Sequence, residues 1–150
     1  MGPHDGRVDH HPDRALEGGP GGHLLEQFLQ PPRGDPASEP VEWAAEFRFF
    51  VRDRRVHAWS PYWLNGSLAR KEDEWVVEPE MAAVTRGLVD RLLADPEVDL
   101  PVALVLDAGV IKGRSPALVE ANEASGAGIY GCDPRDVLEV LRAATSRTVG

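Results

Sequence analysis

Two short apolar runs that carry oxygen-bearing side chains constrain this chain more than any other feature. Residues 104–107 (LVLD) end in Asp107, and residues 119–122 (VEAN) contain Glu120 and Asn122. Because side chains two apart on a strand point to the same face, Glu120 and Asn122 project together, roughly 7 Å apart along the backbone. If the two runs pair as a hairpin, Asp107 lies beside them. Three such oxygen ligands suit a magnesium ion shared with substrate phosphates.

Two interpretations of this cluster are open. A buried carboxylate is unfavourable unless something offsets its lost hydration, and a metal ion does so. Alternatively, the three side chains mark strand ends at the surface, with Asn122 capping the next turn. Spacing alone favours this second interpretation, because acidic strand ends are common.

The bulk composition excludes several classes of protein. A chain of 150 residues with 42% hydrophobic and 27% charged residues is typical of one globular domain. A formal net charge of −9 argues against nonspecific nucleic-acid binding, which depends on neutralising phosphates. No apolar run is long enough to span a membrane, and residues 1–30 lack the apolar segment of a signal peptide. A single cysteine permits no internal disulfide, so we expect a cytoplasmic location.

Periodicity and turn residues predict an α+β fold. Residues 1–22 have the composition of a disordered tail and residues 146–150 that of a frayed terminus, which leaves an ordered domain at 23–145. The predicted elements are a strand or helical turn at 23–30, a loop at 31–40, strands at 46–51 and 56–62, a loop at 63–78, a helix at 79–94, strands at 102–110 and 117–122, and a helix from 134. Val84 and Leu138 belong to the predicted apolar stripes of the two helices. This order predicts a small antiparallel sheet backed by helices.

Several other residues have both a functional and a structural interpretation. Glu46 and Arg48 share one strand face, where the arginine could hold a phosphate or carboxylate, although a solvent-facing ion pair is favoured. Three glycines before the last helix allow a ligand to approach the backbone or simply form a turn. Cys132 adjoins a helix N-terminus, where the pKa of a thiol can fall. Packing, rather than ligand stacking, is expected of Trp43, Trp59, Tyr62 and Trp63.

Five segments, taken in order, resemble the C-terminal half of ATP-grasp proteins. They are EFRFFV at 46–51, AWSPYW at 58–63, LVLD at 104–107, VEAN at 119–122 and GIYGCDP at 128–134. The chain looks most similar to the arginine-to-lysine clade of that superfamily, over residues 23–145. The ordered combination is more specific than any one motif.

The resemblance implies a fold in which two α+β subdomains grip ATP. It implies that Asp107, Glu120 and Asn122 hold one or two magnesium ions that bridge the ATP phosphates. It also implies that Arg48 contacts a phosphate or an acylphosphate. The implied reaction joins a small-molecule or peptide carboxylate to an amine through an acylphosphate.

The resemblance further implies a hinge strand that meets adenine and ribose. Its candidate residues are Glu26, Gln27, Phe28 and Leu29. Complete ATP-grasp enzymes have further domains before this strand, which supply a glycine-rich loop and basic residues for the α- and β-phosphates. Neither Lys71 nor Lys112 is placed for that role. We therefore expect a partial ATP-grasp domain, which a separate N-terminal half could complete, and which alone binds Mg-ATP only in the millimolar range, about −4 kcal/mol.

Two other hypotheses compete with an ATP-dependent ligase. The first is a catalytically inactive remnant or binding module of the same fold. The second is an unrelated α+β binding domain with fortuitous acidic strand ends. The complete set of Asp107, Glu120 and Asn122 favours descent from an active enzyme over the unrelated domain.

Overall fold

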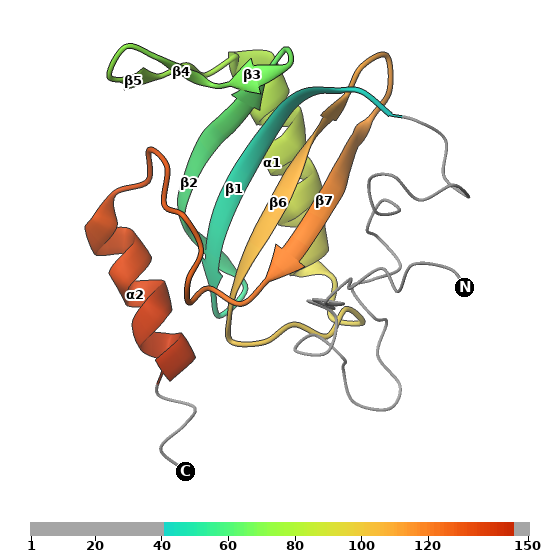
Figure 1. The fold of residues 1–150 in the computed structure, drawn as a ribbon. Helices are drawn as coiled ribbons and strands as arrows, with labels where there is room; N and C mark the ends of the chain where they lie inside the picture. The colour runs from blue at the N-terminus through green and yellow to red at the C-terminus, as the bar shows by residue number, and fades with distance from the viewer. Residues whose placement is uncertain (1–40, 146–150) are drawn as a thin grey trace, which may run out of the picture.

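The described part of the chain is an antiparallel sheet with one helix on each face. The computed structural model describes residues 41–145 (Figure 1). Its elements are β1 (Trp43–Arg52), β2 (Arg55–Leu64), β3 (Ser67–Leu68), β4 (Arg70–Lys71), β5 (Glu74–Trp75), α1 (Pro79–Ala94), β6 (Ala103–Ile111), β7 (Pro116–Asn122) and α2 (Pro134–Thr145). The predicted α+β fold is confirmed. The predicted tail, the hinge segment and residues 146–150 lie outside the described residues.

Two hairpins that are distant in sequence join at the centre of the sheet. The strand order is β3-β2-β1-β6-β7, and every neighbouring pair is antiparallel. The central pair, β1 and β6, places Arg48 directly opposite Asp107, and the β6–β7 hairpin places Asp107 opposite Glu120. Opposite residues on one face of an antiparallel pair lie close enough for their side chains to interact. The register therefore aligns these three side chains in one row.

The α1 face of the sheet holds the larger apolar core. Strand residues that alternate onto this face are buried beneath α1, as expected for a two-layer packing. The core includes Phe47, Phe49, Leu104, Leu106, Leu118, Val89 and Leu92. The helix begins at Pro79, and the side chain of Glu78 accepts a hydrogen bond from the Met81 backbone N–H at 2.8 Å. The apolar packing holds α1 against the sheet, and Figure 1 shows the helix behind it.

The α2 face has a smaller core and a polar region. Phe50 and Val105 pack with Val137 and Val140 of α2. This helix begins after Asp133, whose side chain accepts a hydrogen bond from the Arg135 backbone N–H at 2.9 Å. In Figure 1, α2 lies in front of the sheet toward the β2 side, away from β7 at the opposite edge of the sheet.

The segment predicted as a loop at 63–78 contains regular structure. β2 extends to Leu64, β3 adds a short fifth strand to the sheet, and β4 and β5 form a separate two-stranded hairpin. The loop prediction was therefore wrong for half of this segment. β3, β4 and β5 are only two residues long, so they are too short to show the alternation of apolar and polar residues by which a strand is recognised.

Both helices are rotated slightly from the predicted apolar stripes. Val84 and Leu138 are exposed, so assigning them to the buried stripes was wrong. On α1, Val89 and Leu92 of the predicted stripe are buried, but Thr85 is buried in place of Val84. The hydroxyl of Thr85 donates a hydrogen bond to the Met81 carbonyl at 2.7 Å. Neither helix in the described range has the length and apolarity needed to cross a membrane.

Candidate functional site

A row of polar side chains crosses four strands on the α2 face. Arg48 of β1 lies opposite Ser60 of β2 on one side and Asp107 of β6 on the other, and Asp107 lies opposite Glu120 of β7. Asn122 lies one step further along β7, on the same face as Glu120, because it is two residues away. The predicted hairpin is therefore confirmed, and its register places the three oxygen-bearing residues on one face of the sheet. Asp107, however, lies inside β6 rather than at its tip.

Arg48 and Asp107 form a bidentate ion pair within this row. Arg48 Nε donates to Asp107 Oδ1 at 2.9 Å, and Arg48 Nη2 donates to Asp107 Oδ2 at 2.8 Å. The side chains are 12% and 3% exposed, respectively. Two parallel charge-assisted hydrogen bonds are a strong and directional form of pairing. The favoured expectation of a solvent-facing pair between Glu46 and Arg48 was wrong, because Glu46 is buried and Arg48 pairs across the sheet.

Burial and the pairing with Arg48 shift the pKa of Asp107 in opposite directions. Burial raises the pKa of the Asp107 carboxyl, the hydrogen bonds and charge of Arg48 lower it, and the charge of Glu120 raises it. The hydrogen bond to Asp107 raises the pKa of Arg48, which therefore stays charged. Burial, followed by the negative charge of Asp107, raises the pKa of Tyr62, so the phenol stays protonated. The pair thus places a permanent cation beside a buried carboxylate.

Two stacked tyrosines cover the guanidinium of Arg48. The rings of Tyr62 and Tyr130 lie 5.0 Å apart with an interplanar angle of 13°. Arg48 Cζ lies 4.9 Å from the Tyr130 ring centre and 5.7 Å from that of Tyr62. Trp75 packs edge-on against Tyr130 at 5.5 Å. Cation–π contacts of this kind stabilise a positive charge more strongly where water is excluded. Tyr62 thus stacks on another aromatic residue beside a charged group, in addition to the packing role expected for it.

The segment at 123–133 folds back over this end of the sheet. The Gly128 carbonyl accepts a hydrogen bond from Arg48 Nη1 at 3.0 Å. The Gly131 backbone N–H donates to Ser60 Oγ at 2.9 Å, and a side chain at Gly131 would overlap the Trp75 ring. Tyr130 has a φ of 48°, a conformation that is uncommon for a non-glycine residue. Gly131 therefore permits a close approach of the backbone to Trp75 and Ser60, while the approach of a ligand to these glycines stays a prediction.

The chemistry of the donors fits a hard divalent cation. Asp107 and Glu120 supply carboxylate oxygens, and Asn122 supplies an amide oxygen, which are the ligand types that magnesium takes in proteins. Glu120 is exposed and Asn122 is half-buried. Within the described range, no cluster of three or more His, Cys, Asp or Glu side chains has a metal-binding arrangement. A cation at this face would therefore need the amide of Asn122 as well as the two carboxylates.

Cys132 is not an activated nucleophile. It is buried against the core of the α2 face, and burial raises the pKa of its thiol to about 11. The positive charge of Arg48 acts in the opposite direction but is the smaller effect. The possibility of a thiol with a lowered pKa was therefore wrong. The proposed hinge residues Glu26, Gln27, Phe28 and Leu29 lie outside the described residues.

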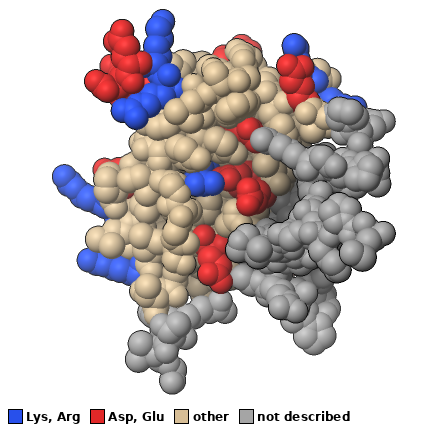
Figure 2. Space-filling view, in the orientation of Figure 1, with Lys and Arg blue, Asp and Glu red and all other residues tan. Residues whose placement is uncertain are grey.

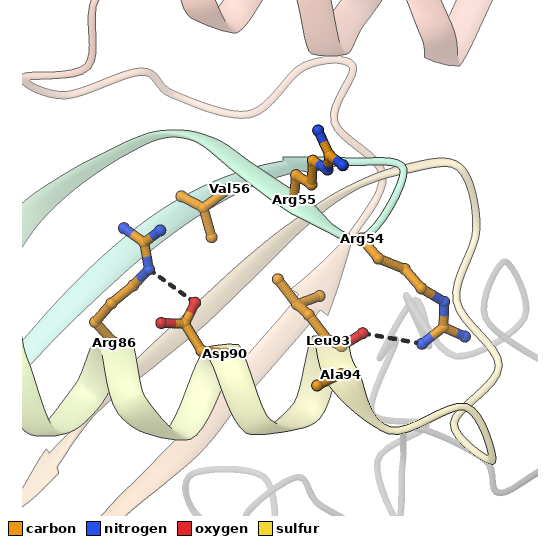
Figure 3. Close-up of a pocket in the computed structure, with 7 residues that line it drawn as sticks. All are labelled: Arg54, Arg55, Val56, Arg86, Asp90, Leu93 and Ala94. Atoms are coloured by element: carbon orange, nitrogen blue, oxygen red, sulfur yellow. Dashed lines mark hydrogen bonds and ion pairs between the residues drawn. The ribbon is translucent and has the colours of Figure 1, made fainter.

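A surface hollow lies elsewhere, between α1 and the start of β2 (Figure 3). Its arginines already have structural partners. Arg54 donates to the carbonyls of Leu93 and Asp95 at the end of α1, and Arg86 pairs with Asp90 at 2.9 Å. Arg55 points away from this hollow in Figure 3. These interactions cap and brace the helix end, so the hollow is a weaker candidate than the row around Asp107.

Comparison with models of protein families identifies the family of this chain. The model of the ATP-grasp domain of the arginine-to-lysine clade, family 2, matches residues 35–140. This chain belongs to that family. The searches of curated proteins and of solved structures found no match. ATP-grasp domains generally bind ATP and magnesium, and the matched range of this ATP-grasp domain includes the whole polar row.

The surroundings of the row include residues that sequence reasoning had not assigned to the site. Ser60, Trp75 and Tyr130 come from three separate segments and meet around Arg48 and Gly131. The available signals were the alternation of Ser60 with Tyr62 and the glycines around Tyr130, but neither reveals which strand lies opposite. Figure 2, drawn from the α2 side, shows a largely uncharged face with acidic and basic side chains meeting near its centre.

Proposed function

We propose that this ATP-grasp domain binds ATP together with magnesium at the face formed by Asp107, Glu120 and Asn122, and that it supports ATP-dependent ligation of a carboxylate to an amine. The observation that carries the proposal is the shared face of these three oxygen-bearing residues within the region that matches the family. Magnesium bound there would neutralise charge on the ATP phosphates.

Each residue of the row would have a distinct part in binding. Glu120 is exposed and opens to solvent, so it would meet the cation first, with the half-buried Asn122 beside it. Asp107 would complete the oxygen ligands from the next strand. Arg48 has a planar guanidinium on the same face, where it could pair with a phosphate through two parallel hydrogen bonds.

The proposed reaction has two displacements. In the first, a carboxylate oxygen of the substrate attacks the γ-phosphorus of ATP, ADP leaves, and an acylphosphate forms. In the second, an amine nitrogen attacks the acyl carbon, inorganic phosphate leaves, and the nitrogen releases a proton to solvent. Fixed cationic groups favour the first step because they stabilise charge that builds up on the transferred phosphoryl group.

A second candidate function is a nucleotide-binding module without ligase activity. It is favoured by one specific observation: both oxygens of Asp107 accept hydrogen bonds from Arg48, and the carboxylate is only 3% exposed. A carboxylate in that state contributes little to a phosphoryl-transfer site. The two candidates share the binding face and differ in whether chemistry follows.

Calorimetric titration with Mg-ATP tests the shared part of the proposal. We expect Glu120→Gln, and separately Asn122→Ala, to abolish the magnesium-dependent part of ATP binding. Glu80→Gln is a matched control, because it removes the same charge from an exposed position on α1, behind the sheet. Unchanged binding by the Glu120 and Asn122 variants would refute the site.

Trapping with hydroxylamine distinguishes a ligase from a binding module. An acylphosphate reacts with hydroxylamine to give a hydroxamate, so a panel of carboxylic acids can be screened without knowing the natural amine. A ligase gives ATP-dependent hydroxamate with at least one acid and releases equal amounts of ADP. Tight Mg-ATP binding with neither product across the panel would favour the binding module.

A further inference from the structure

We infer that Arg48 is a built-in cation that occupies Asp107 until a divalent cation displaces it, and that Tyr62 and Tyr130 hold it in that position. This inference rests on the proposed cation binding at Asp107, Glu120 and Asn122. It adds that Arg48 and the bound cation are alternative partners of one carboxylate. Arg48 is then a positioning residue, and its pairing with Asp107 lowers the affinity of the site for the cation.

Access to Asp107 is the first reason for this inference. Both carboxylate oxygens accept hydrogen bonds from Arg48, at 2.9 and 2.8 Å. Each oxygen keeps further lone pairs, but a side chain that is 3% exposed offers them no open approach. A cation that reaches Glu120 from solvent therefore cannot also bind Asp107 unless the guanidinium moves.

The support of Arg48 is the second reason. Its guanidinium does not depend on Asp107 alone, since it lies over Tyr130 and Tyr62 and donates to the Gly128 carbonyl at 3.0 Å. Tyr130 itself is fixed by stacking on Tyr62 and by the edge of Trp75. The two tyrosine rings and the Gly128 carbonyl therefore position the guanidinium, in addition to its pairing with Asp107.

Displacement of Arg48 would also affect the segment at 123–133. The same guanidinium holds the Gly128 carbonyl and contacts the Tyr130 ring, so its departure removes two contacts from this segment at once. Tyr130 has an uncommon backbone conformation, with a φ of 48°, that relies on such surrounding contacts. Cation binding at the sheet should therefore loosen this segment, and the freed guanidinium can pair with a phosphate on the same face.

Binding of Mn²⁺ without nucleotide, measured from the free-ion signal in electron paramagnetic resonance, tests the inference. We expect Arg48→Met to bind Mn²⁺ about tenfold more tightly than the wild-type protein, because the ion no longer competes with a bidentate partner. Arg52→Met is the matched control. It removes the same charge from the same face of β1, but its partners are Asp53 and Glu139 rather than Asp107. This control should change the affinity by less than about twofold, since distant exposed charges are screened.

Two further measurements keep the inference testable if Arg48→Met does not fold. Tyr130→Leu leaves Arg48 in place but removes its aromatic support, so Mn²⁺ binding should again become tighter, by a smaller factor. In the wild-type protein, Mn²⁺ should increase amide hydrogen exchange within residues 123–133 and leave β1 and β6 protected.

The outcomes separate this inference from the proposed function. Absence of Mn²⁺ binding in every variant would overturn both. Binding by the wild-type protein that is unchanged or weaker in Arg48→Met and Tyr130→Leu would overturn the inference alone. The inference is also overturned if Arg52→Met tightens binding as much as Arg48→Met, because the effect is then one of net charge.

Discussion

Replacing Arg48 with methionine should destabilise the fold strongly. The change leaves Asp107, which is 3% exposed, without the two hydrogen bonds that it accepts at 2.9 and 2.8 Å. Removing one partner of a buried ion pair costs about 3–5 kcal/mol. For a domain of this size that loss lowers the thermal midpoint by roughly 12–20 °C. The aromatic contacts of Arg48 are lost as well, so we expect a loss of stability and a fall in the thermal midpoint near the upper ends of these ranges.

The loss should depend on pH in a defined direction. Burial already raises the folded-state pKa of Asp107 above its ordinary value of 3.8, and Arg48 opposes that rise. A carboxyl with a raised folded pKa contributes stability that is fully present below the unfolded pKa and is lost as pH rises through the folded pKa. Without Arg48 the folded pKa rises further, so more stability is lost at neutral pH. The difference between variant and wild type should therefore be larger at about pH 8 than at about pH 5.

Urea unfolding, followed by circular dichroism at both pH values, measures this difference. Adding Asp107→Asn to Arg48→Met removes the buried charge and should recover part of the loss, with a coupling of about 2–3 kcal/mol in the double-mutant cycle. A destabilisation below about 1 kcal/mol would refute the importance of the buried pair. A loss that is the same at both pH values would refute the role assigned to the Asp107 carboxyl.

Two further predictions concern glycine packing and thiol chemistry. Gly109→Ala should destabilise the protein by about 3 kcal/mol in thermal melts, because its new methyl group would overlap the Ala45 carbonyl oxygen of the neighbouring strand. Gly87→Ala on α1 should instead stabilise the protein by about 0.5–1 kcal/mol in the same melts. Its methyl group would meet only the Arg91 guanidinium, at an ordinary 3.6 Å. Cys132 should react slowly with Ellman's reagent near neutral pH, because burial raises the pKa of its thiol to about 11, and rapid labelling of the folded protein would contradict that burial.

The sequence predicted the β6–β7 part of the site because the information is local. Two apolar runs separated by a short polar turn indicate a hairpin, and the period of two places Glu120 and Asn122 on one face. The hairpin then brings Asp107 beside Glu120, as the register confirms. Local alternation and a short connection were sufficient to predict the β6–β7 part of the site.

The partner of Arg48 could not be predicted in the same way. Arg48 and Asp107 are 59 residues apart in sequence, with α1 between their strands, and only the central β1–β6 pairing brings them together. Alternation placed Arg48 and Glu46 on one face but did not reveal what covers that face. The positions of Trp75 and Tyr130 depend on short segments without periodicity, where nonlocal packing decides the conformation.

A crystal structure of the protein with Mn²⁺ and a nonhydrolysable ATP analogue tests the proposed site most directly. We predict an anomalous manganese peak within coordination distance of the side-chain oxygens of Glu120 and Asn122, with Asp107 released from Arg48 and bound to the ion. The guanidinium of Arg48 should then face a phosphate. A manganese and nucleotide complex bound elsewhere on the domain, with the Arg48–Asp107 pair intact, would contradict the assignment of this face as the ATP and cation site.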